Sequence, residues 1–394
     1  MPIVPMLFDQ LLTHCKPLVR KRPSGSVFSP YLSSIAIGIG LLTACSPPTQ
    51  PVEQHLEPPT TTLPIQDFIF GDEQPFPQCH ASTVLHSAGG RFLVAWFGGT
   101  EEKDDDVGIW LASGQPHAWS APREIAKLRN APHWNPVLFQ AADSTIYLFF
   151  KVGKEIDHWE TWVKTSTDEG ESWSEATELV AGDRGGRGPV RNKPIILSNG
   201  TWLAGASNEA NQVWNAFVDR SSDQGKSWKK TAYLPVDRDE LTGEGIIQPT
   251  LWESEPGLVH MLLRSSNGYI YRSDSDDYGS TWSPVYRTDL PNPNSGIDLT
   301  QLPDGTLALA YNRDNENWGA RAPLAIALSF DNGKTWPRIL DIEEGDPDDE
   351  FSYPAIISYG DTIAVTYTWQ REKIAFWMGT RDQIPESPLA FQSR

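Results

Sequence analysis

Six polar residues recur at similar intervals, each at the start of a run of strand-forming sequence. They are His80, Asn135, Lys193, Gln248, Asp298 and Tyr353. Four of them are followed directly by proline, which has no backbone N–H and therefore suits a strand with a free edge. If the six positions are equivalent in a repeated fold, an imidazole, an amine, a carboxyl group and a phenol face one volume. Such a set suits acid–base or nucleophilic chemistry. The alternative is that these residues solvate a wet channel.

Three arginines lie at the ends of strand-like runs in the second half of the chain. Arg264 ends VHMLLR, Arg321 begins RAPLAIALS and Arg371 follows YTWQ. Arginine binds carboxylates with two parallel hydrogen bonds. Two or three arginines beside the volume that the six polar residues face therefore predict an anionic ligand such as an acidic sugar. The alternative is that each arginine pairs with a surface acid.

The segment GGTEEKDDDVGIW carries a run of acidic residues, of which at most two can face inward. They are Glu101, Glu102, Asp104, Asp105 and Asp106. A carboxyl group near the axis, buried enough to raise its pKa, suits a general acid, and otherwise the run is a solvated loop. Glu209 in SNEANQVW is a further candidate for a buried acid. The run of aspartates could hold Ca2+, but its spacing matches no standard calcium loop, and we predict no metal site. We also predict no cofactor.

Aromatic residues lie in or beside the loops that lead to the six positions. They are Trp134, Trp159, Trp214 and Trp318. Their rings suit stacking on the faces of sugars, although packing in the core is the commoner use of tryptophan.

The elements that position these residues repeat along the chain. The box S-x-D-x-G-x-x-W occurs four times, at Ser166–Trp173, Ser221–Trp228, Ser275–Trp282 and Ser329–Trp336. The final tryptophans are 54 or 55 residues apart, and one further step back reaches Trp119. A period near fifty is typical of a propeller or a solenoid. Glycine suits a positive-φ turn and Ser and Asp satisfy local backbone groups, so we interpret the boxes as structural hairpins.

Each repeat contains alternating apolar runs of strand length, such as IYLFFKV and TLALAYN, and no helical pattern. Four antiparallel strands fit one period, which is a propeller blade. The six polar positions therefore predict an all-β, six-bladed β-propeller over residues 65–394. The last unit is one strand short, and Ile65–Phe70 (IQDFIF) is placed to supply it and close the ring.

The first residues have the features of a bacterial lipoprotein leader. A basic stretch precedes an apolar run that ends in LTAC at Cys45, and residues 46–64 form a Pro/Thr-rich tether. We expect residues 1–45 to be a signal segment, Cys45 to be lipidated, and the protein to be a monomer anchored in the cell envelope, at the periplasmic face or the outer membrane. An ordinary cleaved signal is the alternative.

The charge of the chain excludes some classes of partner. There are 51 acidic and 32 basic residues, for a formal net charge of −19. Such a surface repels nucleic acid and anionic lipid, so we expect a membrane association only through the lipid anchor. An anionic substrate would have to meet a local basic site within this acidic shell.

The boxes are identified as the Asp-boxes of the sialidase superfamily, and the segments that support its predicted-neuraminidase subgroup are HASTV, AWFGGT, WNPVLF, RNKPI, LPNPNSGIDL and EFSYPAI. This resemblance implies a sialidase-type propeller in which Arg264 and Arg321 clamp a carboxylate, Tyr353 is the nucleophile and Asp106 the general acid. There are two departures from the pattern. His80 stands where the superfamily has an arginine, and Gln248 stands where a glutamate activates the tyrosine.

We therefore predict a sialidase-like exo-glycoside hydrolase that releases a terminal acidic sugar from a glycan. Its catalytic residues would be Tyr353, Asp106, His80 and Glu209. Its substrate-binding residues would be Arg264, Arg321, Arg371, Lys193, Asn135, Gln248 and Asp298. Two alternatives stay open: a lyase that cleaves next to a uronic acid with His80 and Tyr353 moving the proton, and a carbohydrate-binding propeller without activity.

Overall fold

The computed structural model describes residues 63–392. The predicted signal segment, the lipidation at Cys45 and nearly all of the predicted tether lie outside the described residues. Within residues 63–392 no helix is long and apolar enough to cross a membrane. The described part is built from six antiparallel sheets and three short 3-10 helices, η1 (Ile156–His158), η2 (Ala210–Gln212) and η3 (Arg381–Gln383).

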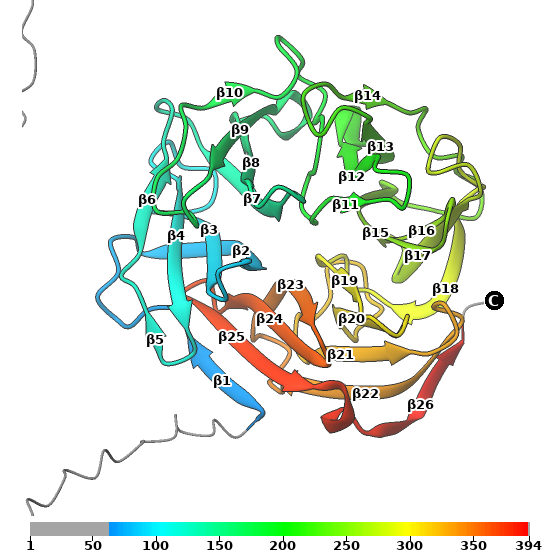
Figure 1. The fold of residues 1–394 in the computed structure, drawn as a ribbon. Coiled ribbons are helices and arrows are strands. Elements are labelled where there is room, and N and C mark those ends of the chain that lie inside the picture. The colour runs from blue at the N-terminus through cyan, green and yellow to red at the C-terminus, as the bar shows by residue number, and fades with distance from the viewer. Residues whose placement is uncertain (1–62, 393–394) are drawn as a thin grey trace, which may run out of the picture. The chain divides into compact units, whose positions relative to one another are not determined.

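The first three sheets follow one another along the chain, and each is one blade (Figure 1). Blade 1 contains β2 (Gln78–His86), β3 (Phe92–Gly99), β4 (Gly108–Gln115), β5 (Ala118–Trp119) and β6 (Arg123–Ala126). Blade 2 contains β7 (His133–Gln140), β8 (Ile146–Val152), β9 (Glu160–Ser166) and β10 (Thr177–Glu178). Blade 3 contains β11 (Ile195–Ile196), β12 (Trp202–Asn208), β13 (Asn215–Ser221) and β14 (Lys229–Lys230).

The other three blades complete the ring. Blade 4 contains β15 (Ile246–Glu255), β16 (Leu258–Ser265), β17 (Tyr269–Ser275) and β18 (Tyr286–Pro291). Blade 5 contains β19 (Asp298–Gln301), β20 (Leu307–Asn312), β21 (Leu324–Ser329), β22 (Thr335–Glu343) and β26 (Glu386–Gln392). Blade 6 contains β23 (Phe351–Tyr359), β24 (Thr362–Trp369), β25 (Lys373–Thr380) and β1 (Ile65–Phe68). The predicted all-β six-bladed propeller is confirmed.

The ring is closed by strands from both ends of the described chain. β1 pairs antiparallel with β25, with Ile65 opposite Met378, and the blue and red strands lie side by side in Figure 1. This confirms the closure predicted for the segment that begins at Ile65. β26 adds a fifth strand beside β22 in blade 5, which the sequence pattern did not indicate.

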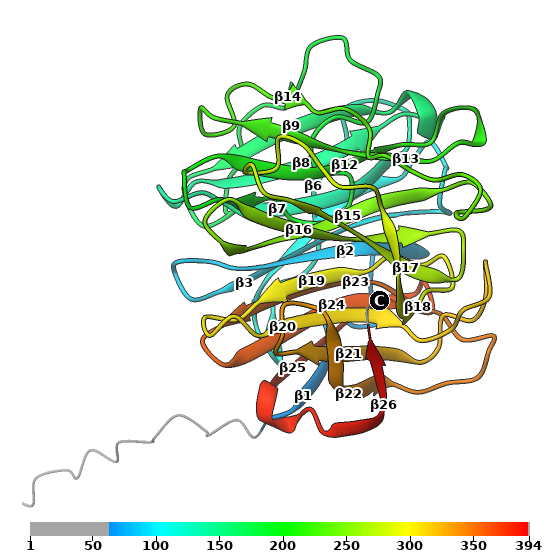
Figure 2. The same ribbon diagram turned by 90° about the vertical axis from the view of Figure 1, so that its right-hand side faces the viewer.

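The core of the propeller lies between the blades. Six clusters of buried apolar residues each join two neighbouring sheets, as Ile326 of β21 and Val365 of β24 do between blades 5 and 6. Figure 2 shows the propeller from its edge, with strands of blades on the two sides of the ring overlapping in the view. Because the apolar faces are buried against neighbouring blades, the inner strands are free to present polar groups to the central axis.

The Asp-box hairpins repeat one hydrogen-bond pattern. In the last box Ser329 Oγ donates to Asp331 Oδ1 at 2.9 Å and accepts from the Gly333 N–H at 2.8 Å. Asp331 accepts from the N–H and the hydroxyl of Thr335 at 2.8 and 2.7 Å. The same bonds recur in the other three boxes, and the four box glycines have φ between +70° and +82°. The four box tryptophans pack against the clusters between the blades, in agreement with a structural role.

Four of the six inner strands carry a β-bulge near the point where they begin. The bulged pairs are Ala81–Ser82, Asn135–Pro136, Gln248–Pro249 and Tyr353–Pro354. The first residue of each pair has a positive φ, between 41° and 56°, although none is glycine. A bulge bends the strand and re-aims a side chain. In blades 2, 4 and 6 the bulge turns the predicted polar residue, Asn135, Gln248 or Tyr353, toward the axis.

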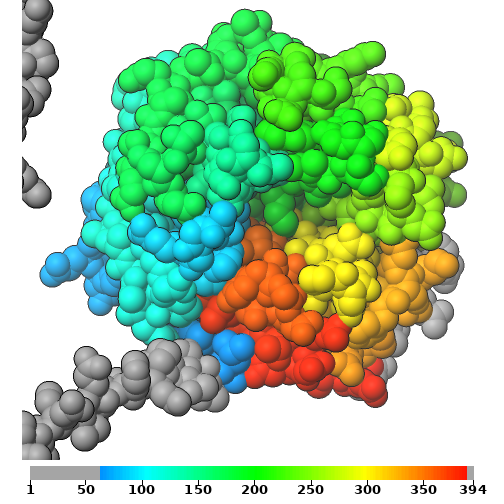
Figure 3. Space-filling model, viewed as in Figure 1, coloured from blue at the N-terminus to red at the C-terminus, as the bar shows by residue number. Residues whose placement is uncertain are grey.

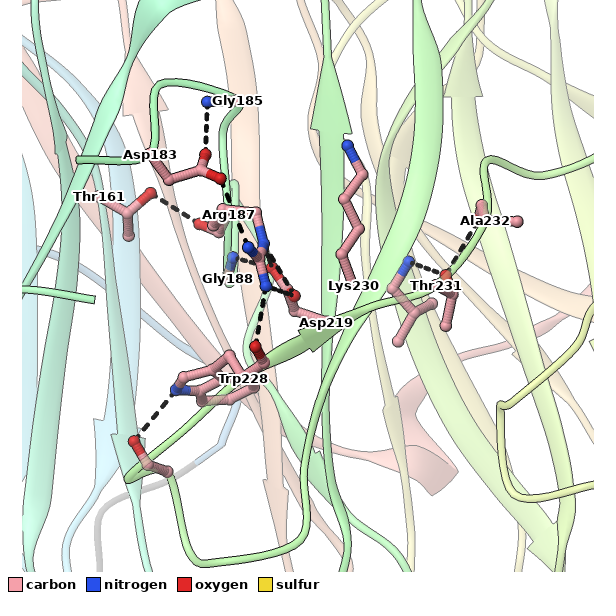
Figure 4. Close-up of polar contacts among 12 residues, drawn as sticks. Thr161, Asp183, Gly185, Arg187, Gly188, Asp219, Trp228, Lys230, Thr231 and Ala232 are labelled. Carbon is pink, nitrogen blue, oxygen red and sulfur yellow. Dashed lines mark hydrogen bonds and ion pairs between the residues drawn. The ribbon is translucent and has the colours of Figure 1, made fainter. Parts of the chain in front are cut away.

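A buried ion pair holds the segment that leads into blade 3. The Arg187 guanidinium donates to Asp219 of β13 through Nε and through Nη2, the latter at 2.7 Å, and the Gly188 N–H donates to the same carboxylate (Figure 4). Arg187 Nη2 also donates to the backbone oxygen of Trp228. Removing one partner of such a pair would leave a buried charge uncompensated, at a cost of about 3–5 kcal/mol. The pair thus fixes the backbone a few residues before the inner edge of blade 3.

Candidate active site

A cavity of about 250 Å³ lies where the six blades meet, and residues from every blade line it. Figure 3 shows the surface hollowed near the centre of the ring. Of the six polar positions predicted to face one volume, four line this cavity. They are His80, Asn135, Gln248 and Tyr353.

Lys193 and Asp298 do not line the cavity, so their predicted place in the ring is wrong. Lys193 Nζ lies 2.8 Å from Asp298 Oδ2, and Asp298 also accepts from Thr250 Oγ1 and the Ile356 N–H. The strand register explains the error. By pairing, Lys193 and Asp298 match Val137 of blade 2, two positions beyond Asn135. Both are therefore structural links between inner strands.

Arg191 and Gly296 occupy the corresponding positions in blades 3 and 5, and the sequence reasoning missed both. Arg191 is 1% exposed, and its Nη2 donates to the backbone oxygens of Tyr353 and Pro354 at 2.5 and 3.0 Å. Burial lowers the pKa of Arg191 to about 10, although Asp298 and Tyr353 act in the opposite direction. Arg191 therefore supports the Tyr353 backbone at its unusual φ of 52°. Gly296 leaves room for the tyrosine, since a Cβ there would lie 3.3 Å from Tyr353 Cγ.

The Tyr353 hydroxyl lies against Arg264. Arg264 Nη1 donates to the Tyr353 oxygen at 2.6 Å and to Gln248 Oε1 at 3.3 Å, while its Nε donates to Asn294 Oδ1 at 2.8 Å. The guanidinium carbons of Arg264 and Arg321 both lie 5.6 Å from the centre of the tyrosine ring. A cationic donor on a phenol oxygen stabilises negative charge on it.

Glu350 joins two further arginines of the cavity. Its carboxylate accepts from Arg321 Nη1 at 2.7 Å, Arg371 Nε at 2.8 Å and Ser352 Oγ at 2.7 Å. Burial on its own raises the pKa of Glu350, but the hydrogen bond from Arg371 and the charges of both arginines outweigh it and lower the pKa. Arg371 also donates to Glu102, and these two carboxylates raise its pKa against the effect of burial.

The three arginines that line the cavity share one property. Among the described residues, Arg264, Arg321 and Arg371 each leave Nη2 without a hydrogen-bond partner. Guanidinium groups with unused donors are suited to hold a carboxylate or another oxyanion. The structure thus brings together the three arginines that the sequence analysis selected, although two of them also pair with Glu350.

His80 is packed beneath this group as a neutral imidazole. Its side chain is nearly inaccessible, its ring centre is 4.3 Å from that of Tyr353, and Nδ1 has no hydrogen-bond partner. Burial, followed by the positive charges of Arg371 and the other arginines, holds the pKa of His80 well below its usual range. His80 thus adds no positive charge where the superfamily resemblance implies an arginine.

The acidic groups near the cavity differ from the prediction for Asp106. Asp106 is exposed, does not line the cavity, and accepts from the N–H and hydroxyl of Thr100 at 3.0 and 2.7 Å. The loop therefore uses it as a local cap, which argues against Asp106 as the general acid. Glu102 faces the cavity instead and is paired with Arg371.

Glu209 also lines the cavity, at the end of β12. Its carboxylate has no hydrogen-bond or ion-pair partner among the described residues, and burial raises its pKa, an effect that Arg264 partly offsets. A carboxyl group whose pKa is raised holds its proton to a higher pH than an exposed one does, and it is suited to donate that proton.

All four tryptophans selected from the sequence line the cavity. Trp134 and Trp159 contact one another with ring centres 5.2 Å apart and are almost completely buried. Trp214 and Trp318 contact one another with ring centres 6.3 Å apart, and both lie near Arg264, at 5.6 and 5.8 Å from its guanidinium carbon. Trp318 is 58% exposed. Trp318 is thus the ring most available to stack on a sugar. Within residues 63–392 no group of three or more His, Cys, Asp or Glu is arranged to hold a metal ion.

The fold and this cavity define the class of protein as a six-bladed propeller of the sialidase type. Residues 90–365 match the family of BNR repeat-like domains. The chain belongs to this family. No curated protein matches the chain.

Solved structures share the fold at low sequence identity. A protein of unknown function from Dyadobacter fermentans is 17% identical, with a TM-score of 0.65 over 84% of this chain and 98% of that one. A mutant of NanB sialidase from Streptococcus pneumoniae is 14% identical, with a TM-score of 0.65 over 81% and 71%. The intramolecular trans-sialidase from Ruminococcus gnavus is 14% identical, with a TM-score of 0.64 over 82% and 99%.

Proposed function

We propose that the protein is an exo-acting glycoside hydrolase that releases a terminal acidic sugar, with sialic acid as the first substrate to test. The observation that carries the proposal is the set of three arginines that line one cavity with Tyr353 and keep Nη2 free, one of which, Arg264, donates to the tyrosine hydroxyl. In this arrangement Arg264 and Arg321 hold the substrate carboxylate, and Arg371 supplies the positive charge that His80 does not.

Tyr353 would act as the nucleophile. Its phenol proton passes to solvent water, and the resulting phenolate oxygen attacks the anomeric carbon while the bond from that carbon to the leaving-group oxygen breaks. The donor from Arg264 stabilises the negative charge on the tyrosine oxygen before the attack and again when this oxygen leaves in the second step. Gln248 does not take the place of an activating carboxylate, so the arginines carry more of this task than they would beside a glutamate.

Glu209 would supply the proton to the leaving-group oxygen. In the second step water attacks the anomeric carbon, its proton returns to Glu209, and the tyrosine oxygen leaves. Glu102 is less suited to this role because its carboxylate is already paired with Arg371. This assignment replaces Asp106 by a group that lines the cavity.

The test is incubation of the full chain with sialylated and with uronate-capped oligosaccharides, following released sugar and ultraviolet absorbance together. Free sialic acid without an unsaturated chromophore is the expected result. Release of no sugar and no binding of any acid-capped oligosaccharide would contradict the proposal. Binding without turnover would instead identify a carbohydrate-binding propeller.

A lyase is the second candidate, because His80 is a neutral imidazole in contact with Tyr353. In a lyase the base removes the proton next to the uronate carboxyl group, and a double bond forms as the leaving oxygen departs. Growth of an unsaturated-uronate absorbance, abolished by His80→Ala, would favour it. Lys193 would have no part in this chemistry, because its amine is paired with Asp298.

A further inference from the structure

A second, open groove of about 620 Å³ adjoins the central cavity. The two share a wall formed by Lys103, Ile156, Glu209 and Trp214. Beyond this wall the groove runs along η1 of blade 2 and η2 of blade 3, which contact one another. A ligand that leaves the cavity past Glu209 therefore enters this groove.

The cavity and the groove differ in charge. Three arginines line the cavity, whereas the outer part of the groove is lined by the carboxylates of Glu155, Asp157 and Glu244. Among the described residues, Glu155 and Glu244 have no ion-pair partner. Of the two lysines in the groove, Lys154 is paired with Asp105 at 3.1 Å, and Lys103 in the shared wall has no ion-pair partner among the described residues, so the carboxylates are in excess and Lys103 is the single uncompensated cation among the lining residues. The groove therefore favours neutral or cationic groups and disfavours anions.

We propose that this groove binds the sugar next to the terminal acidic one and selects for a sugar without a carboxylate. The inference rests on the proposed function, because it places the bond to be cleaved beside Glu209, where the cavity and the groove meet. Trp214 is part of the shared wall but is only 7% exposed, so the discrimination rests on the carboxylates of the groove rather than on stacking against a ring. The acidic groove acts by disfavouring the wrong substrate, while the arginines attract the right one.

This arrangement selects between two kinds of glycan. A terminal acidic sugar on a neutral chain places its only carboxylate among the arginines. A chain made of acidic sugars must place a second carboxylate beside Glu155 and Glu244, where like charges repel. Polysialic acid and polyuronates are thus poor substrates for this protein.

The experiment compares matched pairs of oligosaccharides on the full chain. Sialic acid linked to lactose is compared with sialic acid linked to a second sialic acid, and glucuronic acid linked to a neutral sugar with glucuronic acid linked to a second uronate. The readouts are kcat/KM for release and Kd by calorimetry, at low and at high salt. We expect a preference for the neutral neighbour of about fivefold, smaller at high salt, because the groups involved are partly exposed.

Variants connect the preference to the groove. Glu155→Gln and Glu244→Gln should reduce the preference for a neutral neighbouring sugar. Glu255 is an exposed residue at the far end of β15, and Glu255→Gln should leave the preference unchanged. Equal handling of both members of each pair would overturn the inference and leave the proposed function standing. Failure to bind or cleave any of the four oligosaccharides would overturn both. A salt-independent preference that the groove variants do not change would also overturn the inference.

Discussion

The Asp-box hairpins and the central cavity both contain carboxylates, but these groups differ in how completely they are hydrogen-bonded. In the hairpins every box aspartate accepts several local donors. The hydrogen bonds from Ser172 and from Ser227, the largest causes in each case, help to lower the pKa of Asp168 and of Asp223 to about 2. These groups are satisfied within eight residues of sequence.

The cavity keeps donors and acceptors unused. Arg264, Arg321 and Arg371 have free Nη2 groups, and the Glu209 carboxyl has no partner among the described residues. Tyr353 is held at a positive φ that costs free energy, of order 1–3 kcal/mol. Unsatisfied groups and backbone strain persist where the surrounding structure enforces them, and they gather at functional sites. The repeated Asp-boxes therefore stabilise the fold, whereas the polar residues of the central cavity, which occur once, are the candidates for chemistry.

The sharpest test of this contrast removes one oxygen from the cavity. Tyr353→Phe should reduce kcat by at least about 10³-fold, because the nucleophile is lost. Binding of an acid-capped oligosaccharide, measured by calorimetry, should persist because the arginines are untouched. Unchanged turnover in this variant would refute the role given to Tyr353.

Glu209→Gln should lower kcat by about 10²-fold or more, the usual contribution of a general acid. Only protonated Glu209 donates, and burial raises its pKa, so the wild-type rate should fall as pH rises through that raised pKa. In the Glu209→Gln variant kcat should no longer decrease in this way with rising pH, which a pH profile of kcat measures. If Glu102→Gln removed it instead, the proton donor would be Glu102.

Arg321→Lys should raise KM for a carboxylate-bearing substrate by about 10- to 100-fold, since a lysine cannot reproduce a bidentate contact. The methyl ester of the same substrate should be affected much less. Arg287→Lys, an exposed arginine on β18, is the matched control. Equal effects of the two variants would mean that Arg321 has no particular role in binding the carboxylate.

The smallest effect is expected in the hairpins. Asp331→Ala should lower the free energy of unfolding by about 1–3 kcal/mol, because four donors of the box lose their acceptor, and should leave KM unchanged. The pKa of the box aspartates is depressed, so their contribution is present above pH 4 and is lost as pH falls toward about 2. Urea unfolding at pH 7 and pH 3 measures both. Loss of activity without loss of stability would break the contrast between the two regions.

The sequence by itself determined the fold and much of the candidate site. The 54–55-residue period, the boxes and the strand-length runs predict six blades, because local turn chemistry and alternation are written in short segments. The same repetition correctly aligned Asn135, Gln248 and Tyr353, each the first residue of a bulge at the cavity. In blade 1 the equivalent residue is Ala81, so His80 lines the cavity from one position earlier than predicted. The three arginines could be selected from the sequence because arginine beside a strand end near the axis is suited to bind a carboxylate.

Only the tertiary structure decided which groups inside that frame meet. In blades 3 and 5 the inner strand is two positions out of the expected register, so Lys193 and Asp298 pair with each other, and Arg191 supports the tyrosine. Glu350 joins two arginines, and the loop caps itself with Asp106. The direction of a side chain depends on strand register and on loop hydrogen bonds between distant segments. Because a shift of one residue reverses that direction, the local sequence cannot specify it.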